Sequence, residues 1–139
     1  MAYASTNPYT GQTLQRFDEI DDAALDALLQ AAQTCFSTQW RDTGFAQRRA
    51  ALARAAALMR ERAPQLAALI TLEMGKLLAQ SKGEVALSAA ILDYYAEHAE
   101  ALLAPETLVT PRGRAVVESS PQGVLLGVEP WNYPYSLPC

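Results

Sequence analysis

The chain has 139 residues, of which 50% are hydrophobic and 19% are charged, with a formal net charge of -4. This length and composition fit one soluble globular domain, and the acidic balance argues against a nucleic acid or an anionic membrane as partner. No apolar run approaches the ~20 residues of a membrane span, and the N-terminus lacks the features of a secretory signal, so we expect a cytoplasmic protein.

The first forty residues predict a turn, a short strand and a helix. Asn7–Gly11, with the sequence Asn-Pro-Tyr-Thr-Gly, has the composition of a turn, and Thr13–Phe17 fits a short strand. A helix is expected to begin near Asp21, which can cap it. Cys35 is expected to be a small buried thiol on this helix. Apolar residues then recur on one helical face, namely Leu25, Leu28, Leu29, Ala32 and Phe36.

Two further helices are predicted between residues 43 and 75. The first runs from about Thr43 to Arg62 and is rich in alanine, the strongest helix former. Pro64 is tolerated only in a first helical turn, so it starts the next helix. That helix ends at Gly75, because glycine readily takes the left-handed conformation that closes a helix.

A long fourth helix is predicted from a capping box. Ser81 with Glu84 three residues later is the pattern of a helix start, and the helix is expected to run to about Leu103 and to close at Pro105. Its expected buried stripe is Val85, Ser88, Ala89, Leu92, Tyr95, Ala99 and Leu102.

The last third of the chain predicts a hairpin and a buried strand. Leu108–Thr110 and Ala115–Ser119 flank a turn signal at 111–113. Gly123–Val128 is an unbroken apolar run of strand length, and Pro130 must end it. A strand apolar on both faces belongs in a parallel sheet covered by helices. We therefore expect an incomplete α/β fold, from either a partial sequence or a truncated reading frame.

Four motifs, in this order, resemble those of the aldehyde dehydrogenase superfamily. They are Asn7–Gly11, Leu72–Lys76 (Leu-Glu-Met-Gly-Lys), Tyr94–Ala99 (Tyr-Tyr-Ala-Glu-His-Ala) and Val128–Pro134 (Val-Glu-Pro-Trp-Asn-Tyr-Pro). The third is similar to a stretch typical of the succinate-semialdehyde dehydrogenase branch. The resemblance covers the chain to about Tyr135, and residues 136–139 are expected to depart from the family.

The resemblance implies the N-terminal part of an aldehyde dehydrogenase-like fold. Residues 1–107 would be the helical part of the cofactor-binding domain, and residues 108–121 a hairpin of the oligomerisation element. Residues 122–139 would be the first strand of a Rossmann-like parallel sheet and its Pro-Trp-Asn loop. The full-length protein is expected to be a homo-oligomer, a dimer or a tetramer.

The resemblance also implies NAD(P)-dependent oxidation of an aldehyde, with succinate semialdehyde as the expected substrate. Family enzymes form a thiohemiacetal on a Cys nucleophile, and a side-chain amide stabilises the oxyanion. By resemblance Asn132 would be this donor, and Tyr133 would line the substrate channel. The groove for NAD or NADP would be lined by Val128, Glu129, Pro130, Trp131 and Asn132.

Other candidates have simpler interpretations. Asn132 could be an ordinary turn residue, and Trp131 could serve core packing. His98 is expected to be a solvated surface residue, and Cys139 is terminal and in the wrong context for a nucleophile. Glu73 and Lys76 are expected to be a helix end and its cap. The sequence offers no metal-ligand cluster.

Because the family's nucleophile and general base would lie beyond this stretch, residues 1–139 alone are expected to be inactive. The alternative hypothesis is a stand-alone helical interaction module that co-assembles with full-length subunits. Its support is that the second and fourth predicted helices bury long apolar stripes and that the hairpin has edges that could pair with another chain. Against it, a module adapted to life alone should have polar residues on one face of Val124–Val128, and this run has none.

Overall fold

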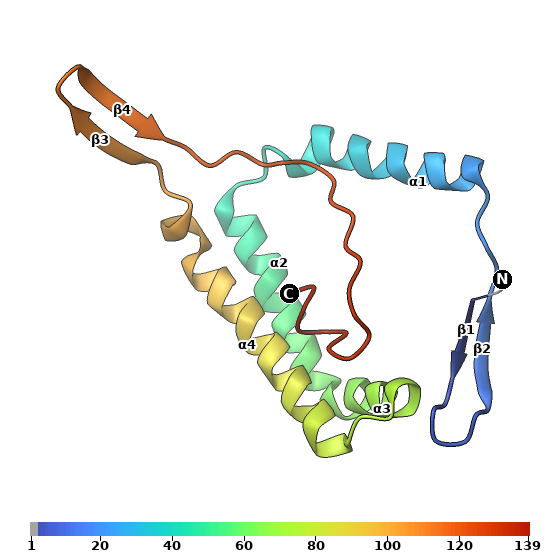
Figure 1. Ribbon diagram of the computed structural model, residues 1–139. Helices are drawn as coiled ribbons and strands as arrows, with labels where there is room; N and C mark the ends of the chain where they lie inside the picture. Colours follow the sequence, from blue (N-terminus) through green and yellow to red (C-terminus); the bar gives the residue numbers. More distant parts are fainter. Residues whose placement is uncertain (1–2) are drawn as a thin grey trace.

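Two long helices that pack together, α2 (Phe45–Glu61) and α4 (Leu78–Leu102), form the centre of the molecule, and the rest of the chain is arranged around them (Figure 1). The computed structural model describes residues 3–139. The other helices are α1 (Asp22–Cys35) and α3 (Ala63–Met74), with a π-helical turn at Phe36–Trp40. The strands are β1 (Tyr3–Thr6), β2 (Thr13–Phe17), β3 (Glu106–Thr110) and β4 (Gly113–Val117).

The N-terminal hairpin confirms the predicted turn and strand. The Asn7 Oδ1 atom accepts hydrogen bonds from the backbone N–H groups of Tyr9 and Thr10, at 2.9 and 3.4 Å. Side-chain bonding of this kind is why Asn favours turns. β2 pairs antiparallel with β1, a strand that the sequence pattern did not predict.

Helix α1 begins as predicted but does not bury its apolar face. The Asp21 Oδ1 atom accepts a hydrogen bond from the Ala24 N–H at 2.7 Å, which confirms the N-cap. No residue of α1 is buried, and the prediction of a buried Cys35 is wrong, because its thiol is exposed. Among the helices and strands of the described residues, α1 packs mainly on its own π-helical extension, and the irregular segment at Gly123 and Val124 lies beside it.

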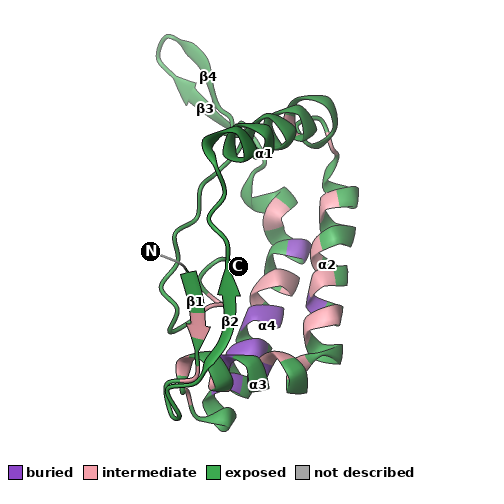
Figure 2. Cartoon of the chain, turned by 90° about the vertical axis from the view of Figure 1, so that its right-hand side faces the viewer, coloured by how far each residue is buried: buried purple, intermediate pink, exposed green. Residues whose placement is uncertain are grey.

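The core lies where α3 and α4 meet, beside the α2–α4 contact. Ala67, Ile70 and Val85 form its buried cluster, and Figure 2 shows the buried residues concentrated on the central helices. The Arg49 Nη2 atom donates to Glu100 Oε2 at 3.0 Å, and Arg60 pairs with Asp93. These ion pairs tie α2 to α4 on the solvent side.

The start of α4 differs from the prediction. The helix begins at Leu78, and the Ser81 N–H already bonds to the Leu77 carbonyl at 2.9 Å. Ser81 is therefore inside the helix, where its hydroxyl bonds to Thr71 Oγ1 at 3.1 Å. The capping box is wrong because Ser81 and Glu84 are both buried and make tertiary contacts instead.

The predicted stripe of α4 is only partly buried. Val85, Ser88 and Ala89 are buried as expected, whereas Tyr95 and Leu102 are 45% and 59% exposed. The buried part is the part that faces α2 and α3. Among the helices of residues 3–139, none is long and apolar enough to span a membrane.

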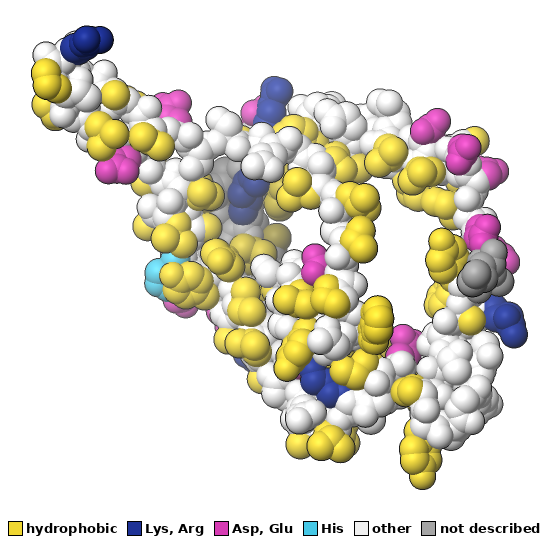
Figure 3. All heavy atoms as spheres, viewed as in Figure 1, with side chains coloured by type: hydrophobic (Ala, Val, Ile, Leu, Met, Phe, Trp, Pro, Cys, Tyr) yellow, Lys and Arg dark blue, Asp and Glu magenta, His cyan; other side chains and the backbone are white. Residues whose placement is uncertain are grey.

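The C-terminal third contains the predicted hairpin but not the predicted strand. β3 and β4 pair antiparallel, with Thr110 opposite Gly113. Residues 123–128 are irregular, and all of them but Gly123 are exposed, with Leu126 90% exposed, so the prediction of a buried strand there is wrong. A strand needs a partner ladder, and no strand of the described chain lies beside this segment. Figure 3 shows hydrophobic side chains along it.

Replacing Gly75 with alanine is expected to lower the free energy of unfolding by about 1–2 kcal/mol. Gly75 ends α3 with φ 76°, and a Cβ atom there would lie 3.1 Å from Pro8 Cγ. Gly83 is the matched control, because it lies within α4 and a Cβ atom there meets nothing within 4 Å. Gly83→Ala should stabilise by about 0.5–1 kcal/mol. Urea unfolding measures the free energy of both variants. Equal changes in the two variants would contradict the assignment of Gly75 as the left-handed residue that ends α3.

Candidate functional site

The Pro-Trp-Asn loop returns to the side of α3 and α4 (Figure 1), where the charged side chains of Lys76 and Glu84 contact it. Gly75 closes α3, and Lys76 follows it in the short link to α4. Glu84 lies two turns further along, on the face of α4 that is buried. The site is therefore built by segments that are far apart in the sequence.

Lys76 and Glu84 form a buried ion pair. The Lys76 Nζ atom donates to Glu84 Oε2 at 2.7 Å, and the two side chains are 8% and 1% exposed. Taking both charges out of water costs several kcal/mol for each, so such a pair is retained only when further hydrogen bonds satisfy it. Those further bonds are made to the loop.

Both members of the pair bind the backbone of residues 131–135. Lys76 Nζ also donates to the Asn132 carbonyl at 3.0 Å and lies 3.6 Å from the centre of the Tyr133 ring. The other oxygen of the carboxylate, Glu84 Oε1, accepts a hydrogen bond from the Tyr135 N–H at 3.0 Å. The ion pair thus holds the loop on both sides of Pro134.

Tyr135 anchors the end of the loop in the core. Its side chain packs against the cluster of Ala67, Ile70 and Val85. Burial, and then the nearby carboxylates of Glu73 and Glu84, raise the pKa of the Tyr135 phenol, because each of them disfavours the phenolate.

Tyr135 is expected to titrate at higher pH than an ordinary tyrosine, whose pKa is about 10. Because its folded-state pKa is raised, its contribution to stability is present below pH ~10 and is lost as the pH rises above that value. Spectrophotometric titration should show an alkaline phase that Tyr135→Phe removes. Tyr9→Phe is the control, because Tyr9 is 94% exposed. A titration curve that Tyr135→Phe leaves without change in shape would contradict this interpretation.

The predicted site residues fall into two groups. Asn132 and Tyr133 lie in the loop that Lys76 contacts, whereas Val128, Glu129 and Pro130 lie on the exposed segment before it. Trp131 is 80% exposed, so the interpretation of Trp131 as core packing is wrong for this structure. Its side chain lines a hollow against α3 whose other lining residues include Glu73, Met74 and Tyr135.

The chain from Val128 to Trp131 presents exposed apolar side chains to solvent. Val128 and Trp131 are 85% and 80% exposed and apolar, and flat aromatic or apolar surfaces of this kind suit packing against a nicotinamide or adenine ring. Lys76, the cation beside the loop, is already paired with Glu84. The fit is therefore to a ring rather than to the phosphates.

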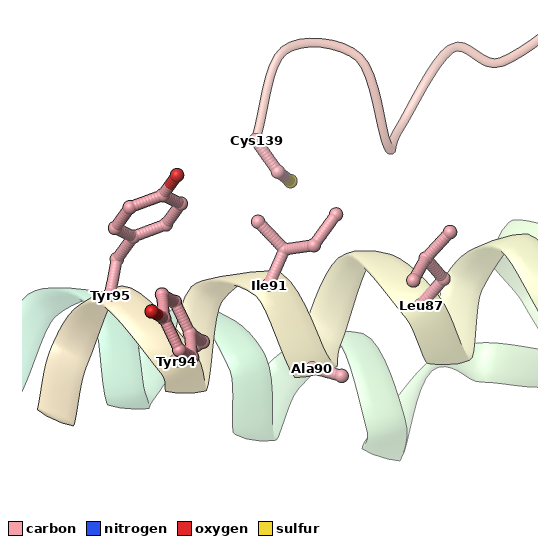
Figure 4. Close-up of a pocket in the computed structure, with 6 residues that line it drawn as sticks. All are labelled: Leu87, Ala90, Ile91, Tyr94, Tyr95 and Cys139. Atoms are coloured by element: carbon pink, nitrogen blue, oxygen red, sulfur yellow. The ribbon is translucent and has the colours of Figure 1, made fainter. Parts of the chain in front are cut away.

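Cys139 faces a groove on α4. The groove is lined by Leu87, Ala90, Ile91, Tyr94, Tyr95 and Cys139, as Figure 4 shows. The thiol donates to the Tyr135 carbonyl at 2.9 Å, and burial raises its pKa, an effect that a hydrogen bond with Ser88 opposes. A raised pKa disfavours the reactive thiolate.

His98 lies on the surface, as predicted. Its Nδ1 atom bonds with the Tyr94 carbonyl at 2.8 Å, and its ring stacks on the Tyr94 ring with centroids 4.4 Å apart. The imidazole is exposed, so it is part of the surface of α4.

The sequence interpretation missed Lys76 and Glu84. Lys76 was expected to be part of a helix end, and Glu84 part of a cap, whereas the two form the buried ion pair that holds the loop. The only sequence signal for this role is that Lys76 and Glu84 are charged. Both positions otherwise have the pattern of a helix end or a helix cap. Neither position carries a pattern that predicts the partner.

Comparison with known proteins decides the family. The profile described as "Aldehyde dehydrogenase family" matches residues 1–139. The chain belongs to the aldehyde dehydrogenase family. The match to the family runs through residues 136–139, so the predicted departure from the family there is wrong.

The family members that are similar to this chain in sequence include proteins named succinate-semialdehyde dehydrogenase (NADP+). The protein named succinate-semialdehyde dehydrogenase (NADP+) of Deinococcus radiodurans is 49% identical over 132 residues, which cover 95% of this chain and 28% of that protein. A protein of Mycobacterium tuberculosis with the same name, numbered 1, is 43% identical over 141 residues, covering 96% of this chain and 30% of its own. The chain thus spans about 30% of the length of the curated relatives it matches.

Solved structures of the family have the same backbone arrangement. The succinic semialdehyde dehydrogenase of Streptococcus pyogenes, solved with NADP+, superposes with a TM-score of 0.91 at 38% identity, over 97% of this chain and 30% of that one. The structure of Gox0499, described in terms of cofactor and substrate selection, gives a TM-score of 0.94 at 35% identity, over 98% of this chain and 30% of that one. The predicted α/β family fold is confirmed.

Proposed function

We propose that this chain is part of an NADP-dependent aldehyde dehydrogenase that oxidises succinate semialdehyde to succinate. The observation that carries the proposal is the 49% identity to a protein named succinate-semialdehyde dehydrogenase (NADP+), over 95% of this chain. The NADP+ complex of the Streptococcus pyogenes enzyme, similar over 97% of this chain, supports the same cofactor and substrate.

Asn132 donates its side-chain amide to the oxyanion that forms on the substrate carbonyl. An amide is neutral, so it donates without altering the protonation of a neighbouring nucleophile. A fixed donor of this kind contributes about 3–4 kcal/mol to stabilisation of the transition state. The contacts of Lys76 with Asn132 and Tyr133 support this role, because they fix the backbone that carries the amide.

Val128, Glu129, Pro130, Trp131 and Asn132 hold the nicotinamide nucleotide along one wall of its site. When bound, the nucleotide supplies the acceptor for the hydride that the aldehyde loses. The exposed apolar faces of Val128 and Trp131 support this role, since packing on a ring would remove them from water. Tyr133 lines the path of the substrate, and its aromatic face is steadied by the Lys76 ammonium.

The parts of the chain have separate roles in this proposal. Residues 1–107 are the helical part of the cofactor-binding domain, residues 108–121 belong to the oligomerisation element, and residues 122–139 carry the Pro-Trp-Asn loop. The enzyme is a homo-oligomer in the cytoplasm. The projecting β3–β4 hairpin, whose five-residue strands are exposed, supports the assignment of residues 108–121.

The nucleophile lies outside residues 1–139 in this proposal. Cys35 is exposed beside the π-helical turn, and Cys139 faces α4. A stand-alone interaction module is the competing idea, but no observation here favours it.

The test compares two samples in one assay of NADP+ reduction with succinate semialdehyde. The protein isolated from its own source should oxidise the aldehyde and prefer NADP+ to NAD+. The purified 139-residue chain should give no turnover, although it should bind the nucleotide weakly if its wall forms alone. Turnover by the 139-residue chain, or none by the native protein with any small aldehyde, would contradict the proposal.

A further inference from the structure

We propose that Lys76 and Glu84 are positioning residues for the reaction, which hold the backbone at Asn132 so that its amide is fixed before the substrate arrives. This inference rests on the proposed role of Asn132. Neither side chain needs to touch the substrate. Each acts through the loop that it binds.

The first argument is how the charges of the pair are used. The Lys76 ammonium has contacts in three directions, with Glu84 Oε2 at 2.7 Å, the Asn132 carbonyl at 3.0 Å and the Tyr133 ring at 3.6 Å. The carboxylate uses its second oxygen for the Tyr135 N–H at 3.0 Å. Both further hydrogen bonds and the ring contact of the pair are with the loop.

The second argument is burial. At 8% and 1% exposure these side chains are shielded from water, so their bonds are strengthened by a low local dielectric. Hydrogen bonds to charged groups are among the strongest that proteins make. Asn132 itself is exposed, so the loop needs an anchor that does not depend on burying the catalytic amide.

The third argument is the rigidity of the supports. Lys76 follows the left-handed residue Gly75, which lies against Pro8. Glu84 is held within the helical ladder of α4, next to the core residue Val85. The reaction rate falls steeply when a catalytic group is displaced by even about 1 Å, so rigid supports are needed to place it.

The direct test uses a charge-free version of the pair. Lys76→Met alone leaves the Glu84 carboxylate buried without its partner, which strongly destabilises the fold and would obscure any effect on the loop. The double variant Lys76→Met with Glu84→Gln removes both charges and leaves the Tyr135 N–H with a neutral, weaker acceptor in place of the carboxylate. Lys82→Met, on the exposed side of α4, is the matched control.

In the 139-residue chain the readout is amide hydrogen exchange. The double variant should exchange the Tyr135 and Leu137 amides about tenfold faster than the control, because Leu137 N–H bonds to the Tyr133 carbonyl within the same loop. Amides of α2 and α4 should exchange at the control rate. Uniformly faster exchange, or no change at Tyr135 and Leu137, would overturn the proposal.

In the native enzyme the readout is the separation of kcat from KM. The double variant should lower kcat about 10- to 100-fold with KM within about threefold, and Lys76→Arg should recover part of kcat by keeping the charge. An unchanged kcat in a variant with a mobile loop overturns the positioning role. If Asn132→Ala itself leaves kcat unchanged, the proposed function fails, whereas the exchange data still decide whether the pair fixes the loop.

Discussion

Replacing Asn132 with alanine is expected to lower kcat of the native enzyme by about 10²- to 10³-fold. The lost group is a donor to the oxyanion, which develops only as the transition state is approached, so KM should change little. The substitution removes the side-chain amide but keeps the contact with Lys76, because Lys76 binds the backbone carbonyl of Asn132 and not its side chain. Steady-state kinetics with succinate semialdehyde and NADP+ measure the effect.

Asn132→Asp is the control for shape. Aspartate has nearly the same size and keeps the carbonyl that Lys76 binds, but its ionised side chain has no donor. It should lose at least as much kcat as alanine does. A loss of less than about threefold in either variant would show that Asn132 is an ordinary turn residue.

Replacing Glu84 with alanine is expected to lower the free energy of unfolding by about 3–5 kcal/mol. The Glu84 side chain is 1% exposed, and its removal leaves the Lys76 ammonium buried without its partner. It also leaves the Tyr135 N–H without the acceptor that it has at 3.0 Å. Urea unfolding, followed by far-ultraviolet circular dichroism, measures the change.

Glu97→Ala is the matched control, because Glu97 lies on the same helix and is exposed. It should change the free energy of unfolding by no more than about 0.5 kcal/mol. Adding Lys76→Met to Glu84→Ala should recover part of the loss by removing the unpaired charge. A Glu84→Ala variant as stable as the control would mean that the pair is not closed in solution.

The elements that the sequence predicted well are those whose signals are local. Asp21 caps α1 through a bond three residues away, and Gly75 ends α3 because its own φ is positive. The turn at Asn7 is likewise formed by its own side chain. Such features depend only on residues that are close in the chain, so they can be predicted from a single sequence.

The features that were predicted wrongly depend on distant partners. Ser81 and Glu84 have the pattern of a cap, but their actual partners are Thr71 on α3 and the Tyr135 backbone 51 residues away. Residues 123–128 have the composition of a buried strand, but no strand of the described chain lies beside them. Composition shows what a segment prefers, whereas its partner decides whether that preference is met.

The candidate site shows the same division. The Pro-Trp-Asn motif directed attention to Asn132, and the structure places Asn132 beside Lys76. Lys76 could not be found from the sequence, because it lies 56 residues from Asn132 and its partner is set by the way α3 and α4 pack. Whether Asn132 acts on the substrate stays a prediction.

The most direct measurement is a crystal structure of the native enzyme with an aldehyde substrate trapped in its site. The account predicts that the Asn132 side-chain amide lies about 2.7–3.1 Å from the oxygen that was the aldehyde carbonyl, with Lys76 still bound to the Asn132 backbone. An amide that points away from this oxygen, with another group of the enzyme donating in its place, would contradict the account.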